Sequence, residues 1–280
     1  MKLPGGLLVD GQLRCDFSFK PITGSIEREI IERNETTDSL ATTLVTALVT
    51  QVTNILNITL ASVAGMVANK ELISSLCSGD RQYLILQLEA IINPASKWLT
   101  IECHACDELI QLQLIPGTLP VKPAGQYFPI TTTQLSIGEV SLRAPNGADE
   151  EALLQQPDNE KQRLSHLLKR LILQSNKSVD IEQLSTDDLD IIDQTLEEMM
   201  PQPSINISTA CPYCDSLQEI TLDIYEWMNE KNNDIENDIH LLAINYHWSE
   251  KEILALPKIR RKHYLQLIEQ ASHLAFEERI

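Results

Sequence analysis

The pattern Cys-x-x-Cys occurs twice in this chain, as CHAC at Cys103 and Cys106 and as CPYC at Cys211 and Cys214. Each pair lies between two segments of extended character, WLTIE and LIQLQL around the first and SINIS and LQEITLDI around the second. In a zinc ribbon such a pair occupies the turn of a β-hairpin, and two pairs place four thiolates tetrahedrally around one zinc ion. The sequence therefore predicts one structural zinc site shared by all four cysteines.

The two pairs are far apart along the chain, since 104 residues separate Cys106 from Cys211, against about 15–20 in a compact zinc motif. The predicted site is therefore discontinuous and would fasten two strand regions together across a helical insertion. Two unrelated pairs, or two redox dithiols, are the alternatives. A thioredoxin-like dithiol lies where a strand passes into a helix, and neither pair has that context. His104 lies inside the first pair, but four cysteines already complete a tetrahedral shell.

The other two cysteines, Cys15 and Cys77, have no partner at metal-binding spacing, and we expect them to be buried apolar side chains. The N-terminal segment MKLPGGLLVDGQLR has Pro and Gly where a secretory signal has an apolar core, and it has no small-residue cleavage site. Cysteines without an export signal indicate a reducing compartment, where thiols bind metal instead of pairing. We therefore expect a cytoplasmic protein.

Strand-like and helical segments alternate along the chain, which predicts an α+β fold of small β-regions, two CxxC hairpins and separate helices. A strand, a turn and a helix over residues 25–33 are expected first. Residues 69–92 are expected to form one long helix or two short ones. Two strands are expected after Tyr127, with a turn near Ile137 and Gly138. We expect three parts: an N-terminal α+β part with the first hairpin over residues 1–148, a helical insertion over 149–204, and a part with the second hairpin and the C-terminal helices over 205–280. An acidic helix over 229–248 is expected within the last part.

Residues 39–69 must be examined as a possible membrane span, because they include no Asp, Glu, Lys or Arg. Thr, Asn and Gln recur throughout this segment, whereas a spanning helix needs about 20 predominantly apolar residues. We therefore predict no membrane span. We expect a threonine-rich helix over residues 37–56, buried against neighbouring helices, followed by a short extended piece.

The formal net charge of −18 disfavours nucleic-acid binding, which requires a dense positive field. One basic run, PKIRRKH, departs from this balance. Ser249 and Glu252 have capping-box spacing and predict a short helix before it, and Pro257 predicts a break before a second helix. The basic residues of this run are Lys258, Arg260, Arg261 and Lys262. They form either a docking surface for an acidic partner or a solvated helix face.

The sequence contains no P-loop, GxSxG, HExxH or dinucleotide-binding motif. Asp80 and Arg81 in SGDRQYL form the most suggestive polar pair. We expect Asp80 to cap a helix and Arg81 to form a structural ion pair, in preference to an active site. The sequence therefore predicts a protein that is not an enzyme.

Several stretches are typical of one known family: LPGGLLVDGQL, FSFKPITGSIE, GDRQYL, CHAC, LPVKPAG, SLRAPNGADEE, CPYC and IHLLAINYHWSEKEILALPKIRRKHYLQLI. Together they resemble the zinc-ribbon-containing baseplate proteins of contractile phage tails and extracellular contractile injection systems, which include hub assembly proteins of T-even-type myophages. The resemblance spans most of the chain and is weakest over residues 39–69. It implies a structural or chaperone-like role in the bacterial cytoplasm, with baseplate or tail subunits as partners. The residues it implies as zinc ligands are Cys103, Cys106, Cys211 and Cys214.

A zinc-ribbon protein that binds nucleic acid or acts in transcription is the alternative. Such a protein needs a basic surface around the ribbon. The charged residues beside both pairs are instead acidic, namely Glu102, Asp107, Glu108, Asp215 and Glu219. A zinc hydrolase would need an open coordination position, and four cysteine ligands leave none.

Overall fold

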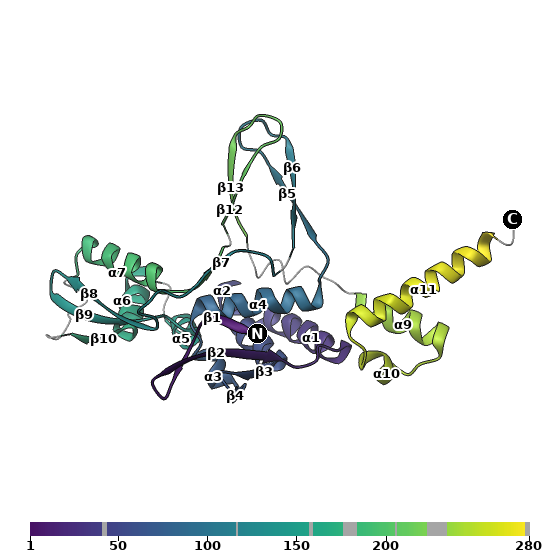
Figure 1. The fold of residues 1–280 in the computed structure, drawn as a ribbon, viewed down its shortest axis with the longest axis horizontal. Coiled ribbons are helices and arrows are strands. Elements are labelled where there is room, and N and C mark those ends of the chain that lie inside the picture. Colours follow the sequence, from purple (N-terminus) through teal and green to yellow (C-terminus); the bar gives the residue numbers. More distant parts are fainter. Residues whose placement is uncertain are drawn as a thin grey trace.

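The computed structural model describes residues 1–40, 44–115, 117–156, 159–175, 184–204, 206–222 and 234–277. The described chain combines helices with small antiparallel sheets, which confirms the α+β class predicted from the sequence. A central body contains the N-terminal strands and the first helices (Figure 1). A long two-hairpin arm, a second mixed unit and a C-terminal helical unit project from it in different directions (Figure 1).

The central body packs helices against an antiparallel sheet. Its strands lie in the order β1 (Lys2–Val9), β2 (Gln12–Phe19), β3 (Leu60–Val63) and β4 (Met66–Val67). Its helices are α1 (Gly24–Leu40), α2 (Leu44–Thr59), α3 (Lys70–Ser74) and α4 (Ser78–Ile92). The core between these layers includes Leu3, Phe17, Leu56, Leu60 and Leu84, all of them buried.

The uncharged segment 39–69 contributes to this core. The predicted helix over 37–56 corresponds to the end of α1 and most of α2, while residues 41–43 lie outside the described residues. Val52 and Ile55 of α2 are buried, and the Thr59 hydroxyl donates a hydrogen bond to the Ile55 carbonyl at 2.7 Å. The predicted burial is confirmed for much of α2 and for Leu60 and Val63 of β3, whereas Met66 and Val67 are exposed. Within the described ranges, no helix combines the length and apolarity needed to cross a membrane.

The second mixed unit is a three-stranded antiparallel sheet covered by two helices. Its strands lie in the order β10 (Ile172–Ser175), β9 (Gly138–Arg143), β8 (Ile130–Leu135), and its helices are α6 (Glu160–Leu171) and α7 (Thr186–Met199). The predicted turn between β8 and β9 is confirmed, since Leu135 pairs with Gly138. The unit's core joins residues from both sides of position 148, namely Leu135, Val140, Leu142, Leu168 and Ile192.

Helix α5 (Gly147–Leu154) links this second unit to the body. It begins with a capping box, in which the Asn146 side chain accepts from the Asp149 N–H while the Asp149 carboxylate accepts from the Asn146 N–H. Asp149 also accepts two hydrogen bonds from Arg143 and one from Arg170. Burial tends to raise the pKa of Asp149, but these arginine contacts outweigh it and hold the pKa below its usual value.

The C-terminal unit contains α9 (Asp234–Tyr246), α10 (Glu250–Leu254) and α11 (Lys258–Glu277). The Ser249–Glu252 capping box and the break at Pro257 are confirmed, whereas residues 229–233 of the predicted acidic helix lie outside the described residues. The Gly24 N–H at the start of α1 donates to the Leu256 carbonyl at 3.0 Å. This bond places the C-terminal unit against the first helix of the chain.

The arm consists of two hairpins that lie side by side (Figure 1). The first hairpin pairs β5 (Lys97–Glu102) with β6 (Leu109–Leu114), and the second pairs β12 (Asn206–Ala210) with β13 (Leu217–Thr221). A short ladder between β7 (Val121–Lys122) and β11 (Gln202–Pro203) joins the chain segments near the base of the arm. Both strand–CxxC–strand hairpins predicted from the sequence are confirmed.

Candidate metal centre

The CHAC segment forms the turn between β5 and β6. The Cys103 N–H donates to the Glu108 carbonyl at 2.9 Å, and the Asp107 N–H donates back to the Cys103 carbonyl at 2.9 Å. Asp107 has a φ of 59°, in the left-handed region that Asp tolerates better than most residues. The Ala105 N–H lies 3.4 Å from Cys103 Sγ, as a donor to a thiolate would. The turn is therefore shaped to hold a negatively charged sulfur.

The CPYC segment repeats this geometry between β12 and β13. The Cys211 N–H donates to the Ser216 carbonyl at 2.9 Å, and the Asp215 N–H donates to the Cys211 carbonyl at 2.9 Å. Asp215 has a φ of 58°, and the Tyr213 N–H lies 3.4 Å from Cys211 Sγ. The repeat in sequence is thus also a repeat in backbone conformation.

The two turns meet at the end of the arm. All four sulfur atoms lie within 4.8 Å of one another, with Cys103 Sγ 3.7 Å from Cys214 Sγ and Cys106 Sγ 3.8 Å from Cys211 Sγ. Tetrahedral zinc with Zn–S bonds of about 2.3 Å requires sulfur–sulfur separations of about 3.8 Å. A disulfide would need about 2.05 Å, and all four cysteines are free. The cysteines therefore form one cluster that can hold a metal ion, and the alternative of two unrelated pairs is wrong.

Few side chains shield this cluster. Cys103 and Cys211 are buried, Cys106 is half-buried and Cys214 is exposed. The apolar packing around the sulfurs comes mainly from the first hairpin, through Ile101, Ile110 and Leu112. The thiols, together with a small apolar cluster, hold the two hairpins together at this end.

Gln218, a residue that was not predicted from the sequence, also joins the hairpins. Its side-chain oxygen accepts from the His104 N–H at 3.2 Å, and its amide nitrogen donates to the Ser216 carbonyl at 3.2 Å. Gln218 is buried at the position where the first hairpin has Ile110, since each residue is the seventh after the first cysteine of its pair. A polar residue in the second repeat at the position of an apolar residue in the first is the sequence feature that could have identified Gln218.

The thiols of Cys103 and Cys106 differ in how readily they lose a proton. The hydrogen bond from the Ala105 N–H lowers the pKa of Cys103 to about 7, against an opposing effect of burial. The backbone N–H of Glu108 favours a Cys106 thiolate, but burial and the neighbouring sulfurs outweigh it and raise the pKa of Cys106 to about 12. One negative charge thus disfavours a second at this distance. A bound cation would reverse the effect, because metal ligation requires thiolates.

The basic run of the C-terminal unit does not form a single exposed patch. Arg261 is only 1% exposed, and its guanidinium bonds Glu27 at 2.8 Å and lies 3.4 Å from an Asp238 oxygen. The predicted surface position of Arg261 is therefore wrong, because two buried carboxylates require a buried cation. Lys262 Nζ lies 3.2 Å from the other Asp238 oxygen.

The remaining members of the run are not fully buried. Lys258 Nζ donates to the Asn93 side chain, and exposed Arg260 contacts the Tyr264 hydroxyl at 3.5 Å. A partner-binding role for Lys258, Arg260 and Lys262 stays a prediction.

The Asp80 carboxylate binds the first strand of the protein and does not cap its own helix. Cys77 occupies the N-cap of α4, while Asp80 accepts from the Gly5 and Gly6 N–H groups at 2.8 and 2.7 Å. The predicted helix-cap role of Asp80 is therefore wrong. Burial raises the pKa of Asp80, partly offset by these two hydrogen bonds.

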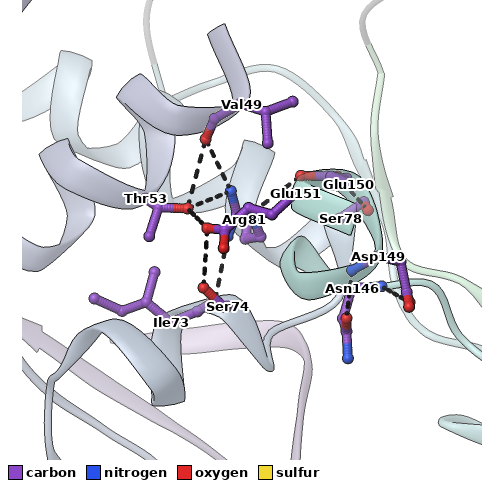
Figure 2. Close-up of polar contacts among 10 residues, drawn as sticks. All are labelled: Val49, Thr53, Ile73, Ser74, Ser78, Arg81, Asn146, Asp149, Glu150 and Glu151. Atoms are coloured by element: carbon purple, nitrogen blue, oxygen red, sulfur yellow. Dashed lines mark hydrogen bonds and ion pairs between the residues drawn. The ribbon is translucent and has the colours of Figure 1, made fainter. Parts of the chain in front are cut away.

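Arg81 forms a buried polar cluster between α2, α3, α4 and α5 (Figure 2). It is 1% exposed, and it donates to the Thr53 hydroxyl at 3.0 Å. Its Nε atom lies 3.5 Å from a Glu150 oxygen, which confirms the predicted structural ion pair. The Glu151 carboxylate accepts hydrogen bonds from Thr53 and from Ser74 in the same cluster (Figure 2). These contacts join helices α2, α3 and α4 of the body to α5.

Comparison of the chain with protein-family models, with curated proteins and with solved structures gives no match.

Proposed function

We propose that the four cysteines hold a structural zinc ion, and that the protein is a non-enzymatic structural or assembly component of a contractile-tail baseplate or related injection system. The observation that carries this proposal is the closed four-thiol cluster that joins two hairpins of separate sequence origin. Its setting is the bacterial cytoplasm, where thiols stay reduced.

The donor set supports zinc and a structural role. Tetrahedral sulfur ligands favour zinc or an iron–sulfur centre over oxygen-binding cations. Cys103, Cys106, Cys211 and Cys214 would supply all four ligands, and zinc would supply a rigid link between the hairpins. Four protein ligands leave no position for a substrate or an activated water. The centre therefore serves assembly and shape.

The baseplate assignment is supported by the sequence motifs that resemble this family and by the arrangement of the molecule. Units projecting in several directions from one body suit a protein that contacts several subunits (Figure 1). The competing nucleic-acid role is disfavoured because residues 98–114 and 206–221 of the arm include no Lys or Arg.

Two measurements test this function. Elemental analysis of protein that has never met a chelator should give about one zinc per chain, the stoichiometry of a four-cysteine site. An iron content and a visible absorption band would instead indicate an iron centre. Deletion of the gene should abolish assembled tail particles, and co-purification from cells that express the neighbouring genes should recover tail subunits. Recovery of RNA polymerase or DNA would contradict the baseplate role.

A further inference from the structure

The end of the arm presents large apolar side chains to solvent. Leu109, Leu217 and Tyr213 are 60%, 61% and 65% exposed. Single exposed apolar residues are common on protein surfaces. These three, however, belong to the two metal-binding turns or directly follow them, at the part of the arm farthest from the body (Figure 1).

The backbone fixes two of these side chains at matching positions. Leu109 and Leu217 each follow, by two residues, an aspartate held at a φ of 58° or 59°. Each leucine also forms the first pair of its hairpin ladder, with Glu102 and Ala210 respectively. A metal bound between the turns would hold both leucines in one relative orientation. Binding through them would therefore cost little conformational entropy.

The exposed Asp, Glu, Lys and Arg side chains around this tip are all acidic, and exposed His104 also lies in the first turn. Asp107, Glu108 and Asp215 are exposed beside the turns, and Glu102 and Glu219 are exposed on the adjoining strands. A zinc ion with four thiolates would add a net charge of −2 at the same end of the arm. Since the arm segments 98–114 and 206–221 carry no Lys or Arg, its field attracts a basic surface. The same field repels the tip of a second copy of this chain.

We propose that the arm tip, defined as Leu109, Tyr213 and Leu217 with the carboxylates of Asp107, Glu108 and Asp215, docks a protein partner. The partner presents an apolar socket rimmed by Lys and Arg. An apolar centre with a charged rim is the usual anatomy of a protein–protein interface, and complementary rim charges raise the association rate. The inference rests on the proposed metal centre, because the metal orders the tip.

The partner chemistry can be tested with a displayed library of random peptides, selected on the full-length, metal-loaded protein. Selected peptides are then measured against a tip variant, Leu109→Ser with Tyr213→Ser and Leu217→Ser. The matched control, Leu8→Ser with Leu13→Ser and Tyr127→Ser, removes apolar side chains that are also exposed but lie away from the arm. Zinc content is measured in each preparation, so that loss of binding is separated from loss of metal.

The enriched peptides should carry Lys or Arg on both sides of Leu, Phe or Trp. The tip variant should keep its zinc and lose at least about tenfold in affinity, as truncation of interface hot spots does. The control variant should bind as the wild type, and added salt should weaken binding. Failure to enrich any tip-dependent peptide, selection of acidic peptides, or a dimer that forms through the tip would each overturn the inference. Wild-type protein that lacks zinc yet binds through the tip would contradict the metal centre and support the docking surface.

Discussion

The body and the arm of this protein differ in how much apolar surface they can bury. The body packs a four-stranded sheet against several helices, and many side chains in its core are fully buried. In the described part of the arm, the buried hydrophobic cluster consists of Cys103, Ile110 and Cys211. An isolated two-stranded hairpin is marginal in water. The body is therefore stabilised by packing, whereas the arm requires a cross-link between its hairpins.

The two regions also use charge differently. The body and its junctions bury Arg81 and Arg261 beside carboxylates, where a low dielectric strengthens each contact and makes an unpaired partner costly. The arm displays carboxylates to solvent and buries two of its four clustered thiols, those of Cys103 and Cys211. Substitutions in the arm should therefore affect metal content and local protection, whereas substitutions at the buried arginines should affect global stability.

The largest effect should come from Cys211→Ser, because structural zinc supplies about 10–16 kcal/mol of binding free energy in small zinc domains. We expect metal content to fall below about 0.2 equivalents, since the remaining three thiols cannot complete a tetrahedral shell. Hydrogen exchange should rise over residues 97–114 and 206–221 and stay unchanged in the body. Cys15→Ser, outside the cluster, is the control. A variant that keeps full metal and full protection of the arm would show that the cluster does not hold it.

Arg261→Ala should produce the next largest effect, about 3–5 kcal/mol of lost stability, because it removes the buried cation from Glu27 and leaves Asp238 paired with the half-buried Lys262. Urea denaturation measures the loss. The matched control is Arg260→Ala, which truncates an exposed neighbour and should change stability by less than about 0.5 kcal/mol. Equal effects of the two substitutions would contradict the interior role of Arg261.

Gly147→Ala should destabilise the body by about 1–3 kcal/mol, the usual cost of overpacking. A Cβ atom at this position would lie 1.9 Å from Arg81 Nη1, so the buried guanidinium would have to move. Gln155→Ala at the exposed end of the same helix is the control. Thermal denaturation reports both, and an unchanged midpoint for Gly147→Ala would show that the Arg81 cluster is loosely packed.

The smallest effect concerns the pH dependence of the second mixed unit. Hydrogen bonds from the Ser136 hydroxyl and N–H, together with those from Ser185, hold the pKa of Asp188 below its usual value. A depressed folded-state pKa contributes stability above the unfolded value of about 4, and that stability is lost as the pH falls toward the folded pKa.

Asp188→Asn should therefore cost on the order of 1 kcal/mol at neutral pH, and the difference from wild type should shrink as the pH falls below about 4. Urea midpoints at a series of pH values measure it. Asp187→Asn, at the exposed neighbouring position, is the control. A difference that stays constant down to pH 2 would mean that the charge of Asp188 contributes nothing.

Much of the candidate site was predictable because its signal is local. A CxxC pair between two extended segments specifies a hairpin turn, and the conformations of Asp107 and Asp215 show the same local rule applied twice. The capping box at Ser249 is equally local and was predicted with its helix. Short-range hydrogen bonding decides each of these features, so the sequence alone carries them.

The positions of Arg261 and Asp80 were not predictable, because their partners are distant in sequence. Arg261 bonds Glu27, 234 residues away, and Asp80 bonds Gly5, 75 residues away. A basic run in a sequence predicts an exposed helix face, because the sequence does not show which distant carboxylates will contact it. Strand β1 also escaped notice, since Pro4 and the two glycines that follow it are uncommon in strands. Tertiary contacts with α4 override that propensity.

The spacing of the cysteines also has a consequence for synthesis of the chain. Cys103 and Cys214 are 111 residues apart, so at about 5–20 residues per second the ribosome releases the first pair roughly 5–20 s before the last ligand. The second mixed unit, β8 to α7, lies between the two cysteine pairs in the sequence. It is therefore synthesised after the first hairpin and before the second. During this time the nascent chain exposes a two-thiol half-site. The four-cysteine cluster can therefore form only late in synthesis, after the intervening unit has been made.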